Sequence, residues 1–108
     1  MAKKPKVRVP KTAKKGQVIR IKTLFPHRME SGQRKDPKTG EKIPRFIVKE
    51  FVCAFNGEEV FRADMHPGIA ANPFFSFFTR VSESGTFEFK WTDDRDETVT
   101  VHRGIKVD

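Results

Sequence analysis

The sequence predicts an all-β protein that forms a single domain over residues 1–108. In most segments apolar and polar residues alternate with period two, which places every second side chain on the same face of a strand. Turn sequences separate these segments, and 108 residues leave room for one compact domain. About seven short strands with turns between them are typical of an immunoglobulin-like β-sandwich, which is the architecture we expect.

The first half of the chain is expected to supply three strands. In residues 17–23, Ile19 and Ile21 fall on one face, while Arg20 and Lys22 fall on the other. In the longest of the three segments the odd-numbered residues are expected to point one way, namely Ile47, Phe51, Cys53 and Phe55. The expected strands are residues 6–9, 17–23 and 45–55.

The second half is expected to supply four strands. The pair Asn56 and Gly57 tolerates the positive φ angles of a tight hairpin turn. Phe87, Phe89 and Trp91 share one face of a later strand, as in a sheet buried on one side. The expected strands are residues 58–65, 74–80, 86–92 and 98–107.

Two segments do not follow the alternation. Residues 27–42 are polar and rich in glycine, proline and basic side chains, so we expect a long exposed loop, a feature that is often functional. Residues 65–73 contain Pro67 and Pro73, which exclude regular ladder pairing. We expect this segment to cross from one sheet to the other.

The charge is strongly uneven along the chain. The net charge is +8, with 16 Lys and Arg against 4 Asp and Glu in residues 1–50, and 6 against 10 in residues 51–108. This polarity indicates an acidic or anionic partner for the first half. The alternative is that the lysines near the N-terminus form a solvated tail that guards an edge strand.

Several classes of protein are not expected. No segment reaches the roughly 18 to 20 apolar residues of a membrane span. Cys53 is the only cysteine, so no disulfide can form within the chain, and we expect a buried, inert thiol. His27, His66 and His102 form no spacing motif, and no catalytic or phosphate-binding motif is present. We expect neither enzymatic activity nor a cofactor or metal.

The aromatic residues exceed what one core requires. The chain has 11 Phe and no Tyr, and residues 46–48 and 74–78 place apolar side chains on both faces of their strands. A two-layer sandwich covers one face of each sheet, so we expect a partner protein to cover part of the rest. The alternative is that the long loops fold back over these rings. The expected interface residues are Phe46, Val48, His66, Pro67, Asn72, Pro73, Phe74, Phe75, Phe77 and Phe78.

A second function from another class is a basic β-sandwich module that binds a polyanion such as nucleic acid. The supply of Lys and Arg would allow phosphate neutralisation. The aromatic residues, however, are expected in the phase of buried strands and not interleaved with the basic residues as stacking platforms. We therefore expect neither nucleic acid nor a membrane as a partner.

The N-terminal segment has the positive charges of a secretory signal. It lacks the apolar region and the small-residue cleavage site that follow in such signals. We expect the protein either to stay in the cytoplasm or to leave it attached to another protein.

The order of motifs resembles the SoxZ family, the smaller subunit of the SoxYZ sulfur carrier of bacterial thiosulfate oxidation. The resemblance covers essentially the whole chain, and it rests on residues 9–16, 27–36, 55–61, 66–73 and 84–89. It implies a non-catalytic scaffold in a heterodimer, whose SoxY-like partner carries sulfur intermediates on a C-terminal cysteine. It also implies a periplasmic location after export bound to a partner that carries the signal.

Within this family setting, the basic loop is a candidate docking element. Its positive side chains would steer acidic surfaces of other Sox enzymes, or gather anionic sulfur intermediates. A solvated loop is the alternative. We also expect that the isolated chain can self-associate. The loop residues are Arg28, Arg34, Lys35 and Lys38.

Overall fold

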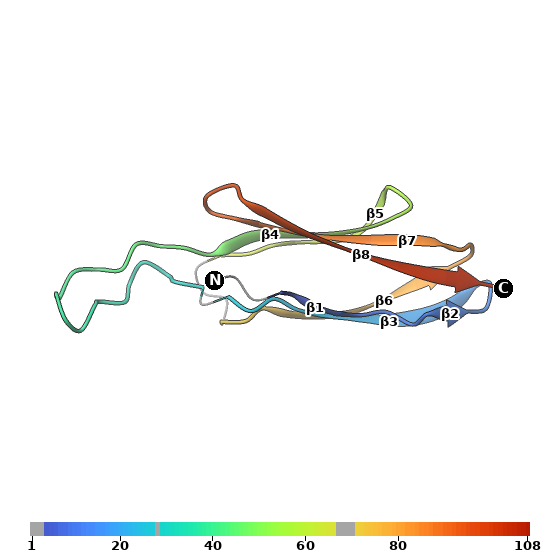
Figure 1. Cartoon of the computed structure of the whole chain (residues 1–108), viewed down its shortest axis with the longest axis horizontal. Helices are drawn as coiled ribbons and strands as arrows, with labels where there is room; N and C mark the ends of the chain where they lie inside the picture. The colour runs from blue at the N-terminus through green and yellow to red at the C-terminus, as the bar shows by residue number, and fades with distance from the viewer. Residues whose placement is uncertain (1–3, 28, 67–70) are drawn as a thin grey trace.

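The computed structural model describes residues 4–27, 29–66 and 71–108. Eight strands form two sheets that pack face to face, and the described residues contain no helix (Figure 1). The predicted all-β sandwich is therefore confirmed. The smaller sheet has the order β1-β3-β6, with β1 at Lys6–Arg8, β3 at Gln17–Leu24 and β6 at Phe74–Val81.

The larger sheet has the order β2-β8-β7-β4-β5. Each of the seven predicted strands is present, and the structure adds β2, a two-residue strand parallel to β8. Alternation cannot be detected in two residues, which is why the sequence did not indicate β2. The strands are β2 at Thr12–Ala13, β4 at Val48–Phe55, β5 at Glu58–Asp64, β7 at Gly85–Asp93 and β8 at Thr98–Val107.

Strand β4 begins later than expected and changes phase near its start. Ile47 and Val48 are both fully buried, although neighbours in a regular strand point to opposite faces. The pairing of β4 with β7 shifts register between Val48 and Glu50, so Lys49 is an extra residue on β4. This bulge lets both Val48 and Phe51 point into the core, which the simple odd-residue pattern did not anticipate.

Phe51 lies at the centre of the core. Its ring stacks on Phe75 of the smaller sheet with a centroid distance of 5.1 Å, and lies 5.0 Å from the ring of Trp91. Phe87, Phe89 and Trp91 are buried on one face, as predicted. Complete burial of one such side chain stabilises the fold by about 1.5–3 kcal/mol, so this aromatic layer holds the two sheets together.

The hairpin between β4 and β5 turns at Asn56 and Gly57, with φ angles of 51° and 86°. The prediction from this pair is confirmed. The Asn56 side chain also accepts a hydrogen bond from the Thr86 amide at 3.0 Å. Gly85 is needed beside it, because a Cβ atom at Gly85 would lie 2.1 Å from the Asn56 Oδ1 atom.

The predicted loop is an extended two-stranded arm. It protrudes from one end of the sandwich and accounts for much of the 58 Å length of the molecule (Figure 1). Glu30 and Phe46 pair through two backbone hydrogen bonds of 2.8 and 2.9 Å. Nearer the tip, the backbones of Lys35 and Lys42 form an isolated antiparallel β-bridge. We call residues 29–46 the arm. The polar composition of the segment hid this pairing.

Asp94 anchors the base of the arm to the sandwich. Its carboxylate accepts two hydrogen bonds of 3.0 Å from the Arg45 guanidinium and one of 3.1 Å from the Ile47 amide. Met29, buried and with a φ of 56°, accepts a hydrogen bond from the Val48 amide through its sulfur. The hydrogen bond from Arg45 is the main reason why the pKa of Asp94 lies below its usual value.

We predict that Asp94→Asn lowers the free energy of unfolding by about 1 kcal/mol at pH 7, because a paired carboxylate is lost. A carboxyl whose folded pKa is depressed contributes stability above its unfolded pKa and loses it as the pH falls through the folded pKa. The difference between wild type and variant should therefore shrink below about pH 4. Urea unfolding followed by the fluorescence of Trp91, the only tryptophan, measures it. Glu97→Gln, at an exposed residue in the same turn, is the control and should change little.

Candidate docking face

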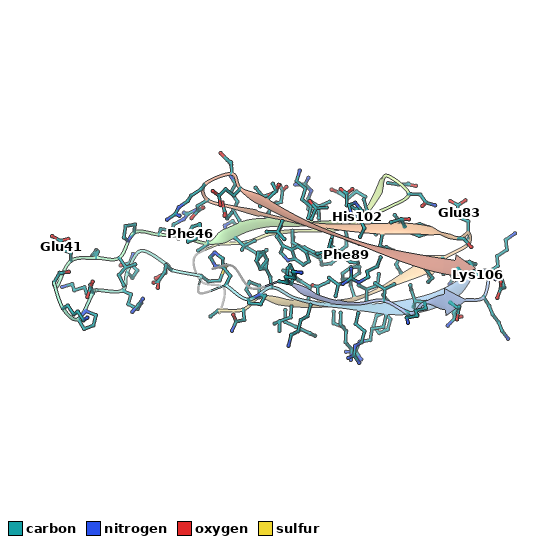
Figure 2. The ribbon with its side chains drawn as sticks, viewed as in Figure 1. Glu41, Phe46, Glu83, Phe89, His102 and Lys106 are labelled. Carbon is teal, nitrogen blue, oxygen red and sulfur yellow. The ribbon has the colours of Figure 1, made fainter. Side chains whose placement is uncertain are left out.

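The charges of the chain are segregated between the two sheets. The three strands of the smaller sheet contain five basic residues and no acidic residue. We call the outer, solvent-facing side of this sheet the β1-β3-β6 face. In Figure 2 its side chains project away from the larger sheet. The five basic residues are Lys6, Arg8, Arg20, Lys22 and Arg80.

The larger sheet is nearly balanced, with five basic and six acidic residues in its strands. Some of these charges pair with one another. Arg62, for example, contacts Glu50 at 2.8 Å and Glu59 at 2.9 Å. No ion pair in the described part of the chain involves a basic residue of the β1-β3-β6 face. The positive charge of that face is therefore available to a partner.

Two large aromatic side chains are exposed on the same face. Phe74 is 57% and Phe78 is 68% exposed. In the antiparallel pairing of β3 with β6, Phe78 lies opposite Arg20, whose guanidinium is 5.9 Å from the ring centroid. The Arg20 Nε atom also donates a hydrogen bond of 2.9 Å to the Ser76 hydroxyl. Cations and phenyl rings thus alternate across the surface.

A groove of about 500 Å³ continues this surface past Phe74. It runs along β1 and reaches Arg103 on β8 of the larger sheet. Basic side chains and apolar side chains line it, and no acidic residue does. The groove suits a ligand surface that combines negative charge with apolar groups. The lining residues are Pro5, Lys6, Val7, Arg8, Lys22, Thr23, Leu24, Phe74 and Arg103.

The structure divides the predicted interface residues of β6 and its surroundings into exposed and buried ones. Phe74 and Phe78 point outward, as expected for a surface. Phe75 is half-buried, and Phe77, like Val48 of β4, belongs to the core. Assigning Val48 and Phe77 to an exposed interface is therefore corrected, because the bulge in β4 and the alternation of β6 turn them inward. Pro73 is buried as well.

The remaining predicted interface residues that the structure describes lie near the base of the arm. Phe46 is half-buried beneath the Arg95 guanidinium, 4.1 Å from its ring centroid. The Asn72 side chain accepts a hydrogen bond of 2.9 Å from the His27 amide, so it links two segments that are far apart in the sequence. His66 is exposed after β5, and Pro67 lies outside the described residues.

The predicted docking residues of the arm divide in a similar way. Arg34 is bound to Glu30, with the guanidinium Nε atom 3.2 Å from a carboxylate oxygen, so its charge is largely used within the arm. Lys35 and Lys38 are exposed toward the tip. Arg28 lies outside the described residues. Of the four predicted docking residues, Lys35 and Lys38 are therefore the ones that the described part of the arm presents as exposed cations.

The sequence did not indicate the interleaving of rings and cations on one face. The alternation of residues 17–23 placed Arg20 and Lys22 on the outer side, but nothing in it showed that Phe74 and Phe78 would lie on the adjacent strand. The expectation that aromatic and basic residues do not interleave is wrong for this pair of strands. The sequence did not show which strand would pair with residues 17–23, and without that neighbour the interleaving could not be predicted.

Other kinds of site are not apparent in residues 4–27, 29–66 and 71–108. No cluster of three His, Cys, Asp or Glu side chains there could hold a metal ion. Cys53 is fully buried. None of the described segments forms a helix long and apolar enough to cross a bilayer.

Solved structures with the same fold come from proteins of different names. A superoxide reductase (neelaredoxin) from Ignicoccus hospitalis has a TM-score of 0.73 at 17% identity, covering 99% of this chain and 82% of that one. A putative superoxide reductase from Thermotoga maritima has a TM-score of 0.72 at 15% identity, covering 96% of this chain and 85% of that one. The sulfur carrier protein SoxY from Chlorobium limicola f thiosulfatophilum has a TM-score of 0.68 at 11% identity, covering 96% of this chain and 78% of that one. At these identities the likeness shows the fold alone.

No curated protein sequence matches the chain. Residues 7–102 match the family described as sulphur oxidation protein SoxZ, a stretch that includes β3, β6, the arm and half of β8. The resemblance drawn from the sequence motifs is thereby confirmed, and the chain belongs to the SoxZ family of the Sox sulfur-oxidation system.

Proposed function

We propose that this protein is the non-catalytic subunit of a heterodimeric sulfur carrier in thiosulfate oxidation, and that it binds a SoxY-like partner through the β1-β3-β6 face. The observation that carries the proposal is the pair of exposed rings, Phe74 and Phe78, on an acid-free sheet face in a SoxZ family member. The partner supplies the cysteine on which sulfur intermediates are held.

The physical basis of binding has two parts. Covering an exposed phenylalanine with apolar surface contributes about 1.5–3 kcal/mol, so Phe74 and Phe78 supply affinity. The five basic residues around them attract an acidic partner surface and orient its approach, which acts mainly on the association rate. A complex built in this way persists at moderate salt, although it forms more slowly there.

The chain's own thiol is unsuited to carrying sulfur. Cys53 lies in β4 between the two sheets, and burial raises its pKa to about 12. The thiolate is the reactive form of cysteine, so a group that is buried and protonated at neutral pH neither attacks nor accepts a sulfur intermediate. This property supports a scaffold role.

The arm is proposed as the element that other Sox enzymes contact transiently. Its base is fixed to the sandwich through Asp94. The arm extends beyond the end of the sandwich (Figure 1), and Lys35 and Lys38 are exposed on it. One protein can therefore hold its partner and meet an enzyme at the same time.

Family membership also supports a periplasmic location, which the protein would reach in complex with the partner. Cell fractionation tests this location.

A second candidate is binding of a polyanion such as single-stranded nucleic acid. The alternation of Arg20 and Lys22 with Phe74 and Phe78 favours it, because such ligands stack bases on rings and neutralise phosphates with cations. The two functions differ in salt dependence. Affinity for a polyanion falls steeply as salt rises, whereas a complex with an apolar centre survives.

We predict a stable 1:1 complex with the SoxY-like subunit of the same organism, measured by calorimetry and light scattering. Replacing both exposed rings, Phe74→Ser with Phe78→Ser, should weaken it by about 100-fold, because two apolar contacts are lost. The control is Val60→Ser on β5, which removes a side chain that is 40% exposed on the other sheet. Equal affinity of the double variant and the control would exclude the β1-β3-β6 face.

We predict that a thiol reagent at pH 8 leaves native Cys53 unmodified and modifies it once the protein is unfolded in urea. The reason is its complete burial and raised pKa. Cys53→Ala should bind the partner with unchanged affinity and lose about 1–2 kcal/mol of stability by leaving a small void. Rapid labelling of the native protein would contradict the scaffold role.

We predict that Lys35→Glu with Lys38→Glu slows turnover of the loaded partner by a Sox enzyme about threefold or more at low salt, with the difference shrinking as salt is raised. The control is Lys14→Glu with Lys15→Glu, near the C-terminal residue Asp108 and remote from the arm tip. Unchanged rates at low salt would remove the docking role of the arm.

A further inference from the structure

Strand β6 is an edge strand with a free side. It pairs with β3 along its whole length, from Phe74 to Val81, and with no other strand in the part of the chain that the structure describes. An edge strand presents unpaired N–H and C=O groups to which another strand can bond. At eight residues β6 is longer than the usual strand.

The pairing fixes which backbone groups of β6 are free. The Phe25 amide donates a hydrogen bond of 3.0 Å to the Pro73 carbonyl, so this pair is a bonded pair of the ladder. In an antiparallel ladder bonded and non-bonded pairs alternate. The residues whose N–H and C=O groups face away from β3 are therefore Phe74, Ser76, Phe78 and Arg80, which also carry the outward side chains.

Two of the other edges of the sandwich are protected. β1 has three residues and follows Pro5. The edge of the larger sheet at β2 is only partly covered, because β2 pairs with Lys106 and Val107 alone and leaves residues 98–105 of β8 without a second neighbour in the described part of the chain. β5 carries Glu58, Glu59, Arg62 and Asp64, and its pairing with β4 shifts register between Cys53 and Ala54. Short length, proline, charge and bulges are the usual means of blocking edge pairing.

β6 has none of these devices. Residues Phe74–Val81 contain no proline, show no register shift against β3, and include one charged residue, Arg80, near the end. A long aromatic edge without a bulge is a template for strand addition.

We infer that the SoxY-like partner adds a β-strand to the free edge of β6 and thereby extends the β1-β3-β6 sheet. The inference rests on the proposed function and specifies how that partner binds. Backbone hydrogen bonds along the edge fix the register of the added strand, and its alternate side chains lie on the two sides of the extended sheet.

The chemistry of the added strand follows from its neighbours. Its outward side chains lie beside Phe78 and Arg80 of β6, with Arg20 of β3 on the far side of the Phe78 ring, which suits acidic and apolar residues. Its inward side chains meet the half-buried rings of Phe61 and Phe75, whose centroids are 5.8 Å apart at this side of the sandwich. Apolar residues suit that side.

A second copy of this chain fits the edge less well. Pairing β6 with its own copy would join two acid-free faces, each with five basic residues, into one continuous sheet. β6 itself carries only Arg80, but the summed positive charge of the two faces opposes such a pairing. A partner with acidic side chains removes this repulsion.

The test compares Ser76→Pro with Ser76→Ala in calorimetric binding to the SoxY-like subunit. Proline removes the outward N–H of residue 76, and it is tolerated on an edge strand because that N–H does not bond to β3. Alanine keeps the N–H and removes the same hydroxyl and its hydrogen bond to Arg20. We expect Ser76→Pro to bind at least about tenfold more weakly than Ser76→Ala.

Residue-resolved amide exchange on the wild-type chain gives a second readout that needs no variant. In the complex, the amides of Phe74, Ser76, Phe78 and Arg80 should gain protection, whereas those of Phe75 and its bonded neighbours are already protected by β3. A 1:1 complex in which these outward amides exchange as in the free chain, and in which both Ser76 variants bind equally, would overturn strand addition and leave the proposed function standing.

Two further outcomes are separable. Absence of any complex with wild type would overturn the proposed function, and strand addition with it. Protection of the outward amides in the isolated chain, rising with concentration and unchanged by the partner, would assign the edge to a second copy and overturn the hetero-partner.

Discussion

A sheet has two faces, and a two-layer sandwich buries only one of them. The inner face of the smaller sheet packs on Phe51 and Trp91 of the larger one, and this contact defines the core. The outer face remains in water with Phe74 and Phe78 upon it. The unburied face is also the part of the protein from which acidic residues are missing. The stability of the fold and its capacity for binding therefore depend on opposite sides of the same three strands.

The separation of charge gives that outer face its character. On the larger sheet, basic residues such as Arg62 are neutralised by neighbouring carboxylates, so little net field remains. On the smaller sheet, cations such as Arg20 have no carboxylate beside them in the described residues. The shared fold with superoxide reductases and with SoxY shows how widely this sandwich is used, and the distribution of surface residues distinguishes one protein from another.

The arm is a second exposed surface, separate from the β1-β3-β6 face. Because Asp94 binds both Arg45 and the Ile47 amide, the arm leaves the sandwich in a defined direction. The bulge at Lys49 serves the same junction, since it lets Val48 enter the core together with Phe51 close to where the arm begins. The local irregularities of β4 thus position the most exposed segment of the molecule.

The sequence by itself determined the fold class, seven of the eight strands, the Asn56 turn and the family, because alternation and turn chemistry are local properties of the chain. Tertiary structure alone decided that Val48 and Phe77 are buried, and that residues 29–46 pair as an arm. It also decided that Arg20 lies opposite Phe78, two residues that are far apart in the sequence. Strand order and register arise from long-range packing, and no local pattern encodes which strand will be the neighbour or which edge will stay free.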